Sequence, residues 1–333
     1  MRKPASGILK IAASVAVSLL AGYLALRNVE LEQVLTGIRQ ADIALTAVVP
    51  ILIAAAQVVR SLRWGLLLEP LQPVSQRLLL PITCVGFLFV WILPARLGEM
   101  ARPYLLGQNS DIGLTSAMGS VVLERIIDAV FLTGLLALCL PALQIPGWLL
   151  SSFQGFVSIL VVVALLLLLG SGSRFRGWLL RIASKFLPAT MCETLQRAGA
   201  KFYSGMQAAS SGKKLAAVLT LTLVIWGMGV VTFMALFKAM GLELGWFAAI
   251  NVMVWTCIGI ALPAAPGFIG NYHYACVVAL TLFGILKETA LAYAILIHFL
   301  TVVVLVVMGV VCINVPGLKL GFPVQRHRLA REE

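Results

Sequence analysis

Charged residues are scarce in this sequence. Asp, Glu, Lys and Arg make up 11% of the 333 residues, and acids are the rarer kind, with 13 Asp and Glu against 25 Lys and Arg. The six cysteines are scattered without a CxxC or Cys/His cluster, a pattern that indicates neither a metal site nor a disulfide framework. A nucleotide-binding glycine loop is missing too, which disfavours a pump driven directly by ATP. We therefore expect no metal and no other cofactor.

In contrast to charged residues, long apolar stretches are abundant in the sequence. Hydrophobic residues make up 61% of the chain and the mean hydropathy is +1.01, values typical of integral membrane proteins. A helix needs roughly 20 apolar residues to cross a bilayer. We expect an all-α integral membrane protein with six full spans. The expected spans are 11–26, 44–59, 116–140, 149–170, 215–237 and 289–313.

The net charge of +12 would suggest nucleic acid in a soluble protein, but here its distribution indicates topology. Basic residues cluster at the N-terminus, in segment 170–214 and in the tail, which places all three on the cytoplasmic side by the positive-inside rule. Both termini are then cytoplasmic, and no nucleic-acid partner is expected. Arg60, Arg63 and Arg77 are assigned to the same side. With these constraints two apolar blocks that contain Pro and Gly, 78–93 and 246–283, cannot cross fully and are expected to enter and return.

The two expected re-entrant hairpins have similar tips. LPARLG at 93–98 and LPAAPG at 262–267 agree at four of six positions, and the hairpins enter from opposite sides. This arrangement is typical of inverted-topology repeats, in which substrate sites form near the midplane; chance recurrence of LPA and Gly is the alternative. The predicted organisation is a single membrane domain, 1–333. It comprises a first half 1–170 with hairpin 78–108, a cytoplasmic amphipathic segment 171–214, a second half 215–318 with hairpin 246–286, and a basic tail 319–333.

The central segment carries an apolar stripe at helical spacing that ends before Pro188. Such a stripe, flanked by Arg and Lys, is typical of a helix lying on a membrane surface. We expect it to contact anionic lipids at the cytoplasmic face. The stripe consists of Phe175, Trp178, Leu179, Ile182 and Phe186.

The first hairpin tip combines a break with charge. Non-helical backbone at membrane depth is tolerated only where it is buried in protein or lines a water-filled cavity, so the turn from Pro94 to Gly98 predicts a cavity. Arg96 and Arg102 could bind a phosphate through their forked guanidinium groups, with Glu99 orienting one of them. The alternative, chiefly for Arg102, is that the arginine extends to the lipid headgroups at the inner interface; for Arg96 the site is favoured.

The next span contains VVLERIIDAVFL, with Glu124, Arg125 and Asp128 between apolar residues. Glu124 and Asp128 are four residues apart and share a helix face, and Arg125 is close enough to pair with a carboxylate. Charge inside a membrane costs roughly 2.5–3.5 kcal/mol per residue on insertion scales, so three such residues predict a functional site. A structural ion network that holds the hairpin to this span is the alternative.

The second tip is followed by polar residues rather than by Arg, Lys, Asp or Glu. The break contains Pro263, Pro266, Gly267 and Gly270. Asn271, Tyr272 and His273 follow it, and either His273 or His298 could exchange a proton near neutral pH. For His298, which is alone in an apolar span, a hydrogen-bonded packing role is favoured.

Four motifs in order carry a resemblance to a known family: RSLRW at 60–64, LPARLGEMARPYLL at 93–106, ERIID at 124–128 and PGFIG at 266–270. Together they resemble the flippase-like family defined by the transmembrane part of lysylphosphatidylglycerol synthases, over nearly the whole chain. The resemblance implies lipid translocation. It also implies that the path is lined by Pro94, Arg96, Gly98, Glu99, Arg102, Glu124, Arg125 and Asp128.

Two departures from the family pattern affect what it implies. Family members often have an acidic residue soon after the second Pro-Gly turn, where this chain has His273, so the resemblance does not carry over the family's coupling chemistry or substrate charge. The sequence also ends about 20 residues after its last span. We therefore expect no soluble aminoacyl-transferring domain and no lysyl-lipid synthesis by this polypeptide alone.

The leading hypothesis is a bacterial inner-membrane transporter that moves an anionic or phosphate-bearing lipid between leaflets. An intramembrane enzyme that modifies a lipid headgroup is a second possibility, disfavoured because no nucleophile or metal set is evident. A third is an accessory subunit that anchors a glycosyltransferase or synthase. The identity of the lipid, the oligomeric state and any synthase partner stay open.

Overall fold

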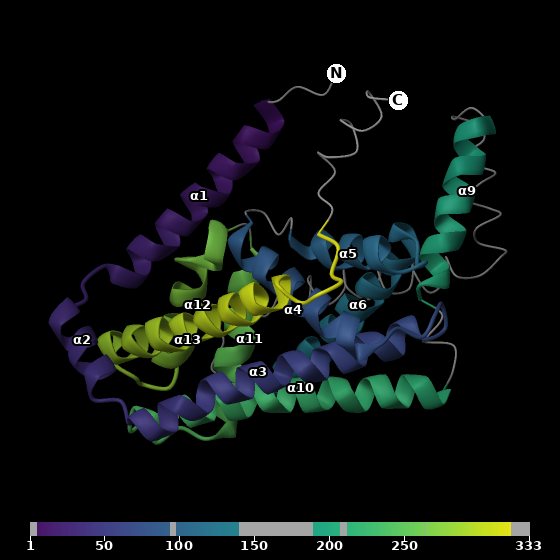
Figure 1. Cartoon of the computed structure of the whole chain (residues 1–333). Coiled ribbons are helices and arrows are strands. Elements are labelled where there is room, and N and C mark those ends of the chain that lie inside the picture. Colours follow the sequence, from purple (N-terminus) through teal and green to yellow (C-terminus); the bar gives the residue numbers. More distant parts are fainter. Residues whose placement is uncertain (1–4, 94–97, 140–188, 207–211, 263, 321–333) are drawn as a thin grey trace.

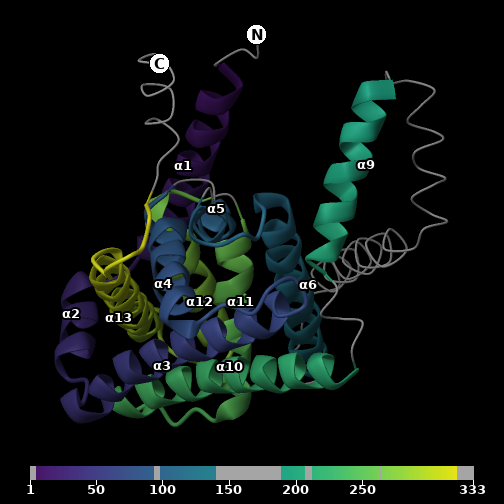
Figure 2. The same ribbon diagram turned by 45° about the vertical axis from the view of Figure 1, so that its right-hand side comes forward.

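The computed structural model describes residues 5–93, 98–139, 189–206, 212–262 and 264–320. Every regular element within these ranges is a helix, in agreement with the all-α prediction. Helix α9 projects from the edge of a bundle formed by most of the others (Figures 1 and 2). The helices are α1 (Ala5–Leu26), α2 (Leu31–Arg39), α3 (Ile43–Leu68), α4 (Gln76–Ile92), α5 (Ala101–Asn109), α6 (Leu114–Cys139), α9 (Ala189–Ser204), α10 (Gly212–Ala239), α11 (Trp246–Ala261), η4 (Pro266–Phe268), α12 (Asn271–Thr281) and α13 (Lys287–Ile313).

Three helices in the described part of the chain are long and apolar enough to cross a membrane. They are α3, α10 and α13, with mean hydropathies of 2.0, 2.1 and 2.9. Helix α6 has 26 residues but carries three charged residues in its middle, and α1 meets α2 at a bend of 84°. Five of the predicted spans overlap α1, α3, α6, α10 and α13, whereas 149–170 lies outside the described residues. The chain is thus a helical membrane protein, and the count of six spans stays a prediction.

Specific polar contacts fix the bend between α1 and α2. Asn28 adopts a positive φ of 59°, a conformation that asparagine tolerates better than most residues. The Lys287 Nζ donates hydrogen bonds to the carbonyl oxygens of Leu24 (2.9 Å) and Arg27 (2.6 Å), which lack partners within α1 because the helix ends there. This lysine therefore attaches the end of α1 to the start of α13.

The helices form two sets of four with the same order of lengths. Helices α3, α4, α5 and α6 have 26, 17, 9 and 26 residues, and α10, α11, α12 and α13 have 28, 16, 11 and 27. They begin at residues 43, 76, 101 and 114 in the first set and 212, 246, 271 and 287 in the second, an offset of about 170 in each case. The motifs at 93–98 and 262–267 have this same offset.

The counterpart helices α3 and α10 lie side by side and run antiparallel (Figure 1). At one end the amide of Asp42 donates to the carbonyl of Ala239 (2.7 Å), and at the other Lys214 pairs with Glu69 (3.4 Å). Contacts between the halves are also reciprocal, since α4 packs on α13 while its counterpart α11 packs on α6. Each half therefore places its first short helix against the last long helix of the other half.

Both pairs of short helices fold back at a tight glycine contact. A Cβ on Gly98 would collide with the backbone of Phe89 and Val90, so residue 98 lies directly against α4. In the second half, a Cβ on Gly259 would meet the side chain of Ala275 and the backbone of Asn271. Helix–break–helix hairpins thus occupy both predicted places. Entry into and return from a bilayer stays a prediction for each.

The predicted amphipathic segment 171–214 is described only in part. Its apolar stripe and Pro188 lie outside the described residues, whereas residues 189–204 form α9. The end of α9 packs on α6, because a Cβ on Gly119 would collide with the Phe202 carbonyl and one on Gly205 with the Ser116 carbonyl. This part of the segment is therefore attached to the bundle.

Candidate functional site

Glu124 of α6 is the centre of a buried charge cluster. Its side chain is 0% exposed, and three guanidinium groups contact it. Arg102 of α5 forms two parallel bonds, Nη1 to Oε1 at 3.1 Å and Nη2 to Oε2 at 3.0 Å. Arg125 Nη2 lies 2.7 Å from Oε1, and Arg63 Nη2 of α3 lies 3.2 Å from the same atom. One carboxylate therefore joins three helices.

Asp128 extends the cluster to the second half of the molecule. Arg63 binds it in a bidentate manner, with Nη1–Oδ1 at 2.6 Å and Nη2–Oδ2 at 3.0 Å. Two α10 side chains complete the set: Trp226 donates its Nε1–H to Oδ1 (3.3 Å), and Thr222 accepts from Arg63 Nη1 (3.0 Å). Since a buried charge is tolerated only when paired and hydrogen-bonded, this network fixes α3, α6 and α10 relative to one another.

The local sequence explains how Arg102 reaches Glu124. Its stem lies over Gly86 of α4, where any Cβ would collide with Arg102 Cγ. The guanidinium carbon lies 4.3 Å from the centroid of the Trp64 ring, and Trp64 in turn donates to Ser120 Oγ (3.1 Å). A glycine and an aromatic face thus make room for a planar cation that a carboxylate then orients.

The structure brings together much of the predicted first site. Glu124, Arg125 and Asp128 share one cluster, as their spacing on the helix requires, and Arg102 joins them. The alternative placement of Arg102 among headgroups is wrong, because this residue is 3% exposed and bonded to Glu124. Glu99 lies within electrostatic reach of Arg125. Pro94 and Arg96 lie outside the described residues, so their part in the site stays a prediction.

Arg63 is a site residue that the sequence reasoning missed. The positive-inside rule uses it, with Arg60, only as a topology signal, but its side chain is 1% exposed and pairs with both carboxylates of α6. The reason is that α3 continues to Leu68, nine residues beyond the predicted end of the span at 59. The RSLRW motif carried a usable signal, because an arginine beside an aromatic residue within an apolar helix needs a buried partner.

Two arginines of the cluster keep free bonding capacity. Arg125 is 42% exposed although both of its carboxylate partners are more deeply buried. Arg60 is half-buried with its guanidinium carbon 5.1 Å from the Phe87 ring centroid, and among the described residues it has no carboxylate within ion-pair distance. Arg60 also lies within electrostatic reach of Arg125 and Asp128. Within the described part of the cluster, these two arginines are thus less completely buried than Arg63 and Arg102.

The second break is characterised by unusual backbone angles and neutral hydrogen bonds rather than by charged side chains. Gly267 and Gly270 have positive φ angles of 72° and 90°, and Phe268 between them has φ 56°, an uncommon value for a bulky residue. Ser18 of α1 accepts from the Ala265 amide (2.7 Å) and donates to Asn271 Oδ1 (3.3 Å). Helix α1 thus holds the second break in place. Pro263 lies outside the described residues.

The end of α4 meets the second break through aromatic rings. Trp91, at the end of α4, lies edge-on to Phe268 with ring centroids 5.2 Å apart, and its ring centroid is 5.3 Å from that of His298. His298 is also 4.9 Å from Tyr272 and 4.6 Å from His273, and it bonds the Gly267 carbonyl at 2.8 Å. The predicted packing role of His298 agrees with these contacts. The predicted polar group after the second tip is thereby joined to the first hairpin.

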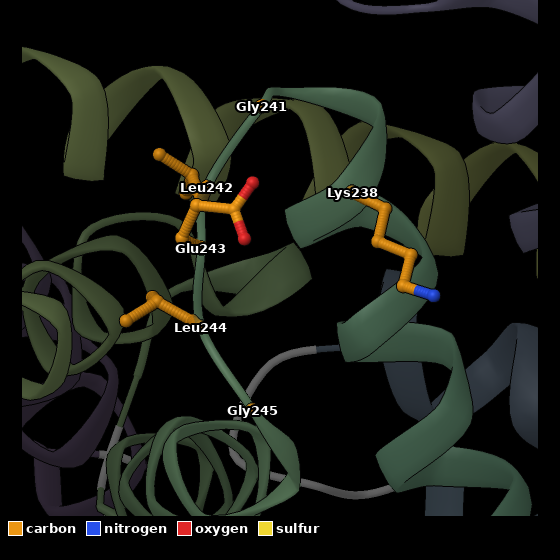
Figure 3. Close-up of a pocket in the computed structure, with 6 residues that line it drawn as sticks. All are labelled: Lys238, Gly241, Leu242, Glu243, Leu244 and Gly245. Atoms are coloured by element: carbon orange, nitrogen blue, oxygen red, sulfur yellow. The ribbon is translucent and has the colours of Figure 1, made fainter.

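Hollows lie beside the equivalent connections of the two halves. One of about 640 Å³ is lined by residues 72–75 between α3 and α4 together with the end of α5. Another of about 410 Å³ is lined by the 241–245 connection between α10 and α11, with Lys238 and Glu243 on different sides of it (Figure 3). Because α3 and α10 are antiparallel, these hollows lie at opposite ends of that helix pair. The charge cluster belongs to neither hollow.

The chemistry available at the cluster is anion binding. Guanidinium groups bind carboxylate and phosphate through paired N–H donors, and their orientation here is fixed by buried carboxylates. In the described part of the chain, no group of three His, Cys, Asp or Glu side chains is placed to hold a metal ion.

Comparison with known proteins shows relatives among membrane proteins. The chain is 24% identical over 270 residues to a UPF0104 membrane protein of Methanothermobacter thermautotrophicus, covering 76% of this chain and 80% of that one. It is 24% identical over 339 residues to the glycosyltransferase AglD of Haloferax volcanii, covering 90% of this chain but 53% of the relative. A UPF0104 membrane protein of Methanocaldococcus jannaschii is 24% identical over 223 residues, 66% of this chain and 90% of that one. No solved structure matches significantly.

A match to a known protein family extends over most of the chain. Residues 11–309 match the family described as the lysylphosphatidylglycerol synthase TM region, a stretch that includes the charge cluster and both breaks. The chain therefore belongs to the lysylphosphatidylglycerol synthase TM region family.

Proposed function

We propose that this protein moves a lipid with a phosphate-bearing headgroup between the leaflets of the cytoplasmic membrane. The observation that carries the proposal is the buried cluster around Glu124, which holds ionised side chains beside a helix break in a membrane protein. Ionised side chains inside a bilayer are costly and mark ion or substrate pathways. The lipid tails would stay in the bilayer while the headgroup crosses beside the cluster.

The charge balance of the cluster favours an anionic group. Its described members are four arginines, at 60, 63, 102 and 125, against the three acids Glu99, Glu124 and Asp128. The Nε–H groups of Arg63 and Arg102 are buried without a partner among the described residues. A phosphate would offset the excess charge and would meet the accessible donors of Arg60 and Arg125 first. Arg63 and Arg102, already paired, would position the carboxylates.

The arrangement of the two halves supports a path between them. Equal helix spacing, antiparallel α3 and α10, and reciprocal packing of α4 on α13 and α11 on α6 are what an inverted-topology repeat requires. We infer six spans, two re-entrant hairpins and cytoplasmic termini on this basis. The substrate path would run along the seam where Trp91 of the first hairpin meets Phe268 of the second.

Reconstituted vesicles test the proposal directly. Protein in phosphatidylcholine vesicles should move fluorescent phosphatidylglycerol from the inner to the outer leaflet, where dithionite quenches it. Fluorescent diacylglycerol, which lacks phosphate and crosses bilayers unaided, calibrates the upper limit of the assay. Folded protein that accelerated no phosphate-bearing lipid, including a polyprenyl phosphate, would contradict the function.

Matched arginine variants connect the activity to the cluster. Arg60→Gln and Arg125→Gln each remove one accessible charge and should slow translocation by at least about tenfold, since a hydrogen bond to a charged group contributes about 1.5–3 kcal/mol. Arg39→Gln makes the same change on the exposed end of α2 and should leave the rate unaltered. Equal loss in all three variants would assign the effect to net charge rather than to the cluster.

A second candidate is a membrane component that serves a glycosyltransferase. The match to AglD covers 90% of this chain and about half of that protein, so a chain of this kind occurs within a protein named as a glycosyltransferase. In this role the membrane domain would present or receive a lipid-linked substrate. Arg60→Gln distinguishes the candidates: slowed translocation favours the transporter, whereas unchanged translocation with intact assembly with a glycosyltransferase favours the component.

A further inference from the structure

We propose that His298, with His273 beside it, is a binding site for a single proton, and that this proton strengthens the contact between the two breaks. The proposal deepens the proposed function by naming the ion that controls movement along the seam. Its link to translocation rests on that function. The proton site itself does not, and it can be measured in protein that transports nothing.

The hydrogen bonds assign the protons of the two neutral rings. The Gly267 carbonyl can only accept, so His298 Nε2, 2.8 Å away, carries hydrogen and its Nδ1 is bare. His273 Nδ1 accepts from the Gly270 amide (3.4 Å), so its own hydrogen lies on Nε2. A further proton can join His298 Nδ1 without breaking the bond to Gly267, whereas on His273 Nδ1 it would remove the acceptor at the start of α12. His298 Nδ1 is therefore the better binding position for the added proton.

Two aromatic rings beside His298 are the neighbouring groups that can attract a cation. The ring centroids of Trp91 and Tyr272 lie 5.3 Å and 4.9 Å from its own, within the distance at which aromatic rings attract a cation. Trp91 comes from the first hairpin, whereas the histidine and Tyr272 come from the second half. An imidazolium at 298 would thus attract the first break to the second.

The pair takes one proton and not two. With ring centroids 4.6 Å apart, two imidazolium groups would repel each other strongly inside the protein. The two histidines face each other from α12 and α13, and no described Asp, Glu, Lys or Arg lies within electrostatic reach of either. The other titratable groups nearby are Tyr272 and Cys276 of α12 and Cys257 of α11. From α4 and α1 the neutral Trp91 and Ser18 face the break.

Access to the site runs through His273. This residue is half-buried, whereas His298 is 7% exposed. A proton that arrives from this more exposed side reaches His298 Nδ1 past the ring of His273, whose centroid lies 4.6 Å from that of His298. His273 keeps its Nε2 hydrogen, and its Nδ1 keeps the bond with Gly270. One proton enters and no other group changes its charge.

Histidine-selective ¹⁵N NMR tests the proton site. The chain has three histidines, and the third, His327, lies in the tail outside the described residues. Between about pH 4 and pH 8, the range in which histidine titrates in proteins, His298 Nδ1 should show the protonation shift while His273 Nδ1 stays an acceptor. His298→Gln, which keeps an N–H donor near Gly267, should remove that signal. Titration of His273 first, or of both rings independently, would overturn the proposal.

The vesicle assay at equal pH on both sides tests the link to movement. In the wild-type protein translocation should slow as the pH falls, by up to about tenfold per pH unit, the limit for one proton. His298→Gln should abolish this dependence. His273→Asn, which keeps an acceptor for Gly270, should retain it, and His327→Asn is the matched control.

The outcomes separate the two proposals. Translocation with no pH dependence in the wild-type protein would refute the coupling and leave the proposed function standing. Dependence that survives His298→Gln but is lost in His273→Asn would place the proton on the wrong ring. A protein that moves no lipid yet titrates at His298 would contradict the function alone.

Discussion

The two breaks share a backbone plan and differ in chemistry. Both join a short apolar helix to a shorter one that folds back on it, at positions about 170 residues apart. The first is followed on α5 by Arg102, which joins ionised side chains of α3 and α6, whereas the second is held by a serine, an asparagine and two histidines. The two breaks therefore have a similar backbone arrangement, whereas their side chains give them different chemistry. In the proposed function, the first side binds the charged headgroup and the second side controls the contact between the breaks.

The largest effect is expected from a substitution in the charge cluster around Glu124. Glu124→Gln is nearly isosteric but leaves Arg63, Arg102 and Arg125 without their shared anion, and breaking a buried pair in this way costs about 3–5 kcal/mol. The free energy of unfolding, measured by denaturant titration in detergent, should fall by that amount. Glu193→Gln removes an exposed carboxylate paired with Arg197 and should change it by less than about 1 kcal/mol. A small effect at Glu124 would show that the cluster is solvated.

The next largest effect is expected from a substitution that strains the backbone of the second break. Gly270→Ala places a Cβ at φ 90° against the Ser18 carbonyl, so strain and collision should together cost about 2–3 kcal/mol. Gly134→Ala in α6 is the matched change, because nothing lies within 4 Å of its Cβ and alanine favours a helix. Thermal unfolding of both variants should show a loss for the first only. Equal melting temperatures would mean that α1 does not hold the break.

A third change sharpens the comparison by separating the two carboxylates. Asp128→Asn weakens the bidentate pair with Arg63 but leaves Glu124 and Arg102 bonded, so we expect a loss of about 2 kcal/mol. Asp128 is 14% exposed, against 0% for Glu124, and this difference should make it the milder substitution. Unfolding free energies measured side by side check the order. A greater loss at Asp128 would contradict the central position of Glu124.

The smallest change alters the contact between the breaks. Trp91→Phe shortens the ring that touches Phe268 and His298 and should cost about 1 kcal/mol, the size of a single aromatic pair. It should also speed translocation, since the seam is weakened while the charge cluster is unchanged. Phe131→Leu is a useful control, because Phe131 stacks on Trp226 away from the breaks. A slower rate in Trp91→Phe would argue against the seam as the path.

Much of this arrangement follows from patterns that are local in the chain. Glu124 and Asp128 share a face because four residues make just over one helical turn, and the offset between the LPARLG and LPAAPG motifs reappears in the helix starts. Arg63 could not be placed in this way. Its role depends on α3 extending past residue 59 and on α6, 61 to 65 residues later in the chain, presenting two carboxylates to it.

By itself the sequence determined a helical membrane protein with interrupted apolar segments and a few charges that needed partners, because hydropathy and helical periodicity act over short distances along the chain. Only the tertiary structure decided which partners they found. The meeting of Arg63 with Asp128, and of Trp91 with Phe268 and His298, joins residues from helices far apart in sequence. Such pairs are selected by packing, and packing is a property of the assembled bundle.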